Sequence, residues 1–106
     1  MYIRMFLSVA AIAGAFVPLV VCAGQTHKVS QAGKLFTPAE IEITRGDTVG
    51  FVNDDAITHN VFAKSMNLNT GAMKPGDSRE VTFDAPGKVA VKCAIHPMMK
   101  MTISVK

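Results

Sequence analysis

The residues best suited to chemistry lie in the last part of the chain, VKCAIHPMMKMTISVK. Cys93 supplies a thiol, His96 supplies an imidazole, and Met98, Met99 and Met101 supply thioethers. Soft sulfur ligands combined with imidazole select copper over hard cations. The spacing therefore predicts a copper site on one tight loop, in which Cys93 and His96 bind the metal together with one of the methionines.

A second imidazole would complete the set of two histidines, one cysteine and one weakly bound methionine that holds copper in electron-transfer sites. His59 is the candidate, because it follows a polar turn at the start of a predicted strand. His27 lies near the N-terminal end of the predicted domain, where chain ends fray, and is expected to be solvated. Such a ligand set suits both oxidation states and leaves no open position for a substrate, which favours a one-electron carrier over an enzyme.

The elements that must position these residues begin after an export signal. The first four residues carry a positive charge, and residues 5–24 carry none. Val21 and Ala23 occupy the small-residue positions of a cleavage site. We therefore expect a helical signal peptide at residues 1–23.

Removal of this segment leaves residues 24–106 as one small periplasmic domain, with Cys93 as its only thiol. A lone thiol in an oxidising compartment is a liability unless it is buried or bound to a metal, so it supports the copper prediction. Two alternatives remain for the N-terminal segment. It could be retained as a membrane anchor, or carry a lipid at Cys22, which the bulky Val21 before it disfavours. A cleaved signal peptide, a retained membrane anchor and a lipid anchor would each export the domain.

The charge of the predicted domain is small and mixed. Eleven Lys and Arg minus Arg4 leave ten, against eight Asp and Glu, which gives a net charge of about +2. Basic and acidic residues are interspersed, and the domain contains no Trp or Tyr. The composition therefore gives no indication of nucleic acid binding.

Short alternating runs separated by turn residues predict an all-β sandwich or barrel, and of these we expect a Greek-key β-sandwich. Strands are expected at residues 27–31, 39–44, 48–53, 58–63, 78–83, 88–93 and 100–106. Residues 64–77 form a long loop that has room for one short helical turn. In such a sandwich the turn before His59 and the loop after Cys93 can meet at the same end.

The whole predicted domain resembles a small cupredoxin of the plastocyanin and amicyanin group. The resemblance is carried by FVNDDAITHNVFA (51–63) and by GDSREVTFDAPGKVAVKCAIHPMMKMTISVK (76–106). It implies a type 1 copper site for electron transfer, with His59, Cys93 and His96 as equatorial ligands.

Two further residues acquire roles from the resemblance. Asn60 matches an asparagine that is expected to brace the two ligand loops by hydrogen bonds. Ile95 stands where many family members have proline, so it keeps an N–H. We hypothesise that this N–H donates to the sulfur of Cys93 and raises the reduction potential.

The axial ligand remains open between two methionines. Plastocyanins have four residues between the loop histidine and the methionine, which selects Met101, whereas amicyanins have two, which selects Met99. Strand alternation favours Met99, because Met101 shares a face with Ile103 and Val105 and that face must be the core.

The remaining apolar residues predict how a partner binds. Pro97 and Met98 are expected to form an apolar rim around His96, joined by Met66 or Met73 from the long loop. The expected partner is a c-type cytochrome or a periplasmic oxidoreductase that meets a monomer in small, transient encounters. Contact with a membrane is expected only if the N-terminal segment is retained. The competing functions are a copper chaperone and a metal-free binding module.

Overall fold

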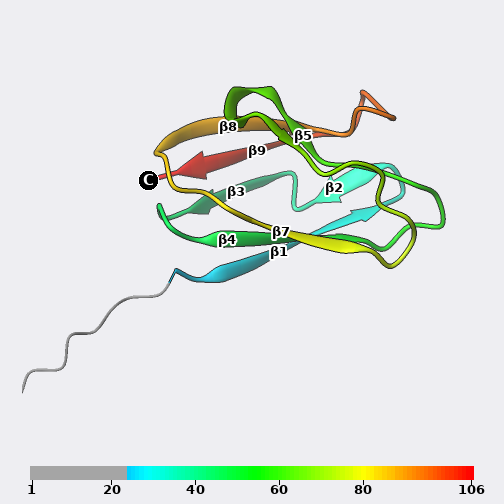
Figure 1. Ribbon diagram of the computed structural model, residues 1–106, viewed down its shortest axis with the longest axis horizontal. Helices are drawn as coiled ribbons and strands as arrows, with labels where there is room; N and C mark the ends of the chain where they lie inside the picture. The colour runs from blue at the N-terminus through cyan, green and yellow to red at the C-terminus, as the bar shows by residue number, and fades with distance from the viewer. Residues whose placement is uncertain (1–23) are drawn as a thin grey trace, which may run out of the picture.

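Residues 24–106 are described by a computed structural model, in which two β-sheets face each other (Figure 1). The first sheet has the strand order β2 (Leu35–Thr37), β1 (Thr26–Ala32), β4 (Thr48–Asn53) and β7 (Ser78–Thr82). The second has the order β3 (Glu40–Ile43), β9 (Lys100–Val105), β8 (Gly87–Lys92), β5 (Phe62–Ala63) and β6 (Leu68–Asn69). The predicted all-β sandwich is confirmed. The helix predicted for residues 1–23 lies outside the described residues.

The alternation of the sequence fills the space between the sheets. In β4 the side chains of Val49, Phe51 and Asn53 are buried, while their neighbours are half-buried. In β9 the buried residues are Met101, Ile103 and Val105. Because successive side chains of a strand point to opposite faces, β4 and β9 each turn one largely apolar face to a common core.

The strand order brings the predicted ligand segments to one end of the sandwich. β1 and β4 run parallel and β3 and β9 run parallel, whereas β8 and β9 are antiparallel neighbours. The chain leaves β4 at Asn53 and reaches His59 through a polar turn. It leaves β8 at Lys92 and returns to β9 through the loop that starts at Cys93.

The structure differs from the predicted strands between residues 58 and 77. The strand predicted for residues 58–63 is regular only at Phe62–Ala63, and His59 forms an isolated bridge with Met73. The following loop contains the short helical turn for which the prediction left room, the 3₁₀ helix η2 (Lys64–Met66). The short strands β6 and β2 were not predicted. None of the helical structure within residues 24–106 has the length and apolar character that a membrane crossing requires.

Candidate metal centre

Three side chains from two segments converge at this end of the sandwich. His59 is held by two backbone hydrogen bonds with Met73, of 3.0 Å (His59 N–H) and 2.7 Å (Met73 N–H). Cys93 follows β8, and His96 lies in the loop that joins β8 to β9. His59 and Cys93 are fully buried, whereas His96 is half-buried.

The donor atoms of the three residues form a compact triangle. Cys93 Sγ lies 3.9 Å from His59 Nδ1 and 3.8 Å from His96 Nδ1, and the two Nδ1 atoms are 3.1 Å apart. The point equidistant from these atoms in their plane lies about 2.1 Å from each, close to metal bond lengths of about 2.0–2.3 Å. The geometry therefore fits a single metal ion.

The loop after Cys93 is closed by its own backbone. Cys93 N–H donates to the carbonyl of Met99 at 3.2 Å, and Met99 N–H donates to the carbonyl of His96 at 2.8 Å. These bonds bring Met99 back beside the start of the loop, where it is fully buried. Met101 pairs with Val91 across β8 and β9 and packs in the core, as the alternation predicted.

The other residues of the predicted rim lie at the surface. Met98 is 76% exposed, and Pro97 is exposed beside it. Met66 and Met73, which were proposed to join this rim, do not lie at it. Met73 is fully buried in the core and its backbone pairs with His59, and Met66 packs against the core from η2. The prediction for Met73 is therefore wrong.

Asn60 joins the two loops, as expected. Its Oδ1 accepts a hydrogen bond from Ala94 N–H at 2.6 Å, and its own N–H donates to Cys93 Sγ at 3.4 Å. The predicted bond from Ile95 N–H to this sulfur is absent within residues 24–106. The backbone N–H that donates to Cys93 Sγ there is that of Asn60. The side chain of Ile95 is 49% exposed, beside the rim.

Asp55 is a partner of His59 that the sequence reasoning missed. Its Oδ2 lies 2.9 Å from His59 Nε2, and Ala56 N–H donates to its Oδ1 at 2.8 Å. The bond from His59, followed by that from Ala56, lowers the pKa of Asp55 to about 2. A carboxylate only accepts, so the shared hydrogen of a neutral ring lies on Nε2, and the lone pair of Nδ1 faces Cys93.

Gln31 supports the site from the opposite sheet. This residue of β1 is fully buried, and its Nε2 donates to the carbonyl of Asn60 at 3.1 Å. Its Oε1 is the one buried side-chain oxygen or nitrogen without a hydrogen bond among residues 24–106. This role could not be predicted, because alternation alone predicts an apolar residue at an inward position.

His27 is half-buried and has a hydrogen-bond partner, whereas the prediction made it a solvated residue at the chain end. Its Nε2 lies 2.9 Å from Asp47 Oδ2, at the other end of β4 from His59. Asp47 also accepts hydrogen bonds from Thr44 N–H at 3.0 Å and Gln25 N–H at 2.9 Å. The bond with His27, followed by the two backbone bonds, holds the pKa of Asp47 below its usual value. His27 therefore has a structural partner far from the metal centre.

The donor set indicates which metal fits. One thiolate, two imidazole nitrogens and a nearby buried thioether suit copper, whereas hard cations require oxygen ligands. Cys93 is a free, buried cysteine, so its sulfur is available to a metal. The cluster of His59, Cys93 and His96 has all its donor atoms within 4.8 Å of one another.

Comparison with known proteins agrees with this chemistry. The model of the family "copper binding proteins, plastocyanin/azurin family" matches residues 23–106. Amicyanin-alpha from Methylorubrum extorquens strain AM1 is 32% identical over 79% of this chain and 74% of its own length. Methylamine utilization protein MauL from Methylophilus methylotrophus is 27% identical over 76% of this chain, and this chain spans about half of its length (49%).

Solved structures show the same fold. A mutant amicyanin in the Cu(I) state superposes with a TM-score of 0.72 at 26% identity, covering 76% of this chain and 82% of the amicyanin.

Proposed function

The chain belongs to the copper-binding plastocyanin/azurin family of small cupredoxins, and on this premise we propose that it is a one-electron carrier. The proposed ligands of its copper ion are His59, Cys93, His96 and Met99. The observation that carries the proposal is the triangle formed by Cys93 Sγ, His59 Nδ1 and His96 Nδ1. The three atoms are close enough to one another to bind a single metal ion together.

Copper supplies the chemistry, because it accepts and releases one electron by cycling between Cu(II) and Cu(I). The protein's own residues hold the ligands so that their positions change little. Asn60 ties the two loops together, Asp55 fixes the ring of His59, and backbone bonds close the loop from Cys93 to Met99. A rigid ligand set suits both oxidation states and so favours fast electron transfer.

The burial of the site supports a carrier rather than an enzyme. His59, Cys93 and Met99 are fully buried, and only His96 reaches the surface. A catalytic metal site requires an open position for a substrate. The proposed set leaves the edge of the His96 ring as the point where electrons enter and leave.

The surface around His96 is the proposed contact with a redox partner. Pro97 and Met98 form its apolar rim, and the exposed side chain of Ile95 extends it. Patches of this kind suit small, transient encounters, which are typical of electron-transfer proteins. We propose a c-type cytochrome or a periplasmic oxidoreductase as the partner of a monomeric protein.

The proposed location is the periplasm. Residues 1–23 are proposed as a signal peptide and residues 24–106 as the exported domain. The charge-free run at residues 5–24 and the cleavage motif around Ala23 support this division. A single free thiol fits an oxidising compartment when it is buried, as Cys93 is.

Electrochemistry and copper transfer together test the function. We expect the copper-loaded protein to show a reversible one-electron response, and its Cu(I) form to keep the metal when a Cu(I) chelator is added, because the ligands are buried. An irreversible response together with rapid loss of Cu(I) to the chelator would contradict the proposal and would favour a copper chaperone.

A further inference from the structure

A second surface lies on the outer face of the five-stranded sheet. Along β8, Val89 and Val91 point toward the core, so Lys88, Ala90 and Lys92 point outward. The metal centre does not use this face.

Two more lysines join it from neighbouring elements. Lys100 of β9 lies directly opposite Lys92 in the register of the two strands. Lys64 begins η2, which packs beside β8. Like charges directly opposite on antiparallel strands destabilise the pair. We call Lys64, Lys88, Lys92 and Lys100 the β8 lysine surface.

None of these four lysines has an ionic partner within residues 24–106, where the one lysine ion pair joins Lys106 to Glu42. The acidic residues of the same sheet, Glu40 and Glu42, lie on β3, and β9 separates that strand from β8. Asp84, in the turn before β8, forms no ion pair with Lys88. No carboxylate of the described residues therefore lies within ion-pair distance of the four lysines.

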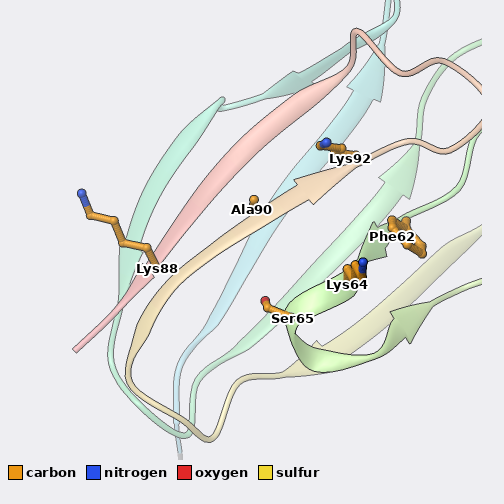
Figure 2. Close-up of a pocket in the computed structure, with 6 residues that line it drawn as sticks. All are labelled: Phe62, Lys64, Ser65, Lys88, Ala90 and Lys92. Atoms are coloured by element: carbon orange, nitrogen blue, oxygen red, sulfur yellow. The ribbon is translucent and has the colours of Figure 1, made fainter.

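The lysines also border a groove. It has a volume of about 590 Å³ and is lined by Phe62, Lys64, Ser65, Lys88, Ala90 and Lys92. Figure 2 shows Lys88 and Lys92 toward the two ends of β8, with Lys64 and Ser65 on the neighbouring η2; Phe62 pairs with Lys92, and the side chain of Lys88 extends away from η2. Apolar residues in the groove and cations at its edge provide a place where acidic side chains of a partner can bind.

We propose that the β8 lysine surface docks an acidic protein partner. The surface offers concentrated positive charge on a chain whose formal net charge is only +3, and charge complementarity of this kind steers association and sets orientation. Lys92 directly precedes Cys93, so a partner bound here lies beside the strand that leads to the proposed thiolate ligand. This contact is separate from the apolar rim around His96. Its role in electron transfer rests on the proposed function, but its charge does not depend on copper.

Binding of an oligo-glutamate peptide to the Cu(I)-loaded protein tests the proposal by NMR. At low ionic strength we expect shifts of the backbone amides of residues 62–65 and 88–92, and their loss when salt is added. The double substitution Lys88→Glu and Lys92→Glu should weaken binding of the peptide by about tenfold or more, because each exposed lysine contributes a modest part of the binding free energy and each glutamate repels the peptide.

The matched control is Lys28→Glu with Lys74→Glu, which changes the net charge equally at exposed positions away from β8. We expect it to weaken binding by less than about threefold. Equal weakening by both double variants, or shifts spread over all exposed lysines, would overturn the proposal. Binding to phosphatidylglycerol vesicles without binding to the peptide would also overturn it and would indicate a membrane surface instead. Because no electron is transferred in this assay, its failure would leave the proposed carrier function standing.

Discussion

Replacing Asn60 by alanine should loosen the joint between the two loops that carry the donor atoms. Asn60 is buried, and its Oδ1 accepts a hydrogen bond from Ala94 N–H at 2.6 Å. The two other bonds of this residue use its backbone and survive the substitution: the donation to Cys93 Sγ and the bond accepted from Gln31. The change therefore removes one hydrogen bond between the loops.

The expected loss of stability follows from that bond. A hydrogen bond contributes about 1 kcal/mol net, and a buried donor left without a partner costs about 1–3 kcal/mol. Ala94 itself is exposed, so water can reach its N–H after the substitution. We therefore expect Asn60→Ala to lower the free energy of unfolding of the copper-free protein by about 1–2 kcal/mol.

Urea unfolding followed by circular dichroism measures this difference. Asn69→Ala is the matched control, because it deletes the same group, which accepts a bond of 2.9 Å from Gly71 N–H at an exposed position. Its expected cost is below about 0.5 kcal/mol. If Asn60→Ala costs no more than Asn69→Ala, the assignment of Asn60 as the joint between the loops is refuted.

Three other predictions concern single side chains. Because the pKa of Asp47 is lowered in the folded protein, the stability that it contributes is present above its unfolded pKa and is lost as the pH falls below about 4. Urea unfolding from pH 7 to acid should therefore show a smaller acid-dependent loss in Asp47→Asn, and equal losses would contradict this account. Asp55→Asn removes a negative charge beside His59, so voltammetry should show a higher reduction potential; an unchanged or lower potential would argue against an electrostatic role for the carboxylate. Met101→Leu should leave the visible spectrum of the copper-loaded protein unchanged and cost less than about 1.5 kcal/mol of stability, whereas Met99→Leu should alter the spectrum. The reverse pattern would assign the axial position to Met101.

The parts of the fold that could be predicted from the sequence are those with one buried face. Residues 48–53 and 100–106 alternate, and the structure places β4 and β9 there with Phe51 and Ile103 inward. Alternation also identified Met101 as a core residue. These assignments depend on local pattern alone, so no knowledge of the other strands was needed.

The segment around His59 was harder to predict, because its structure depends on distant residues. The backbone of His59 pairs with Met73, and that of Asn60 bonds to Cys93 and Gln31 instead of continuing a strand. A single sequence gives no indication of these contacts. Met73 was placed at the surface for the same reason, since its backbone bonds to His59 and Asn53, which are distant in the sequence.

Two residues that support the metal centre, Asp55 and Gln31, differ in whether the sequence could have predicted their roles. Asp55 stands four residues before His59 in a polar turn, and metal-binding histidines commonly donate to a carboxylate, so the pairing could have been proposed. Gln31 could not, because a polar residue at an inward position of β1 acquires its partner only when the two sheets pack. The β8 lysine surface likewise requires the strand order, which brings Lys92 and Lys100 together.

The visible absorption spectrum of the Cu(II)-loaded protein tests the central claim most directly. A cysteine thiolate bound to copper together with two imidazoles should give an intense charge-transfer band. We predict this band in the wild-type protein and its absence in Cys93→Ala, with circular dichroism showing that the variant keeps its β-structure. Wild-type protein that binds Cu(II) without the band, or a band that persists in Cys93→Ala, would contradict the account.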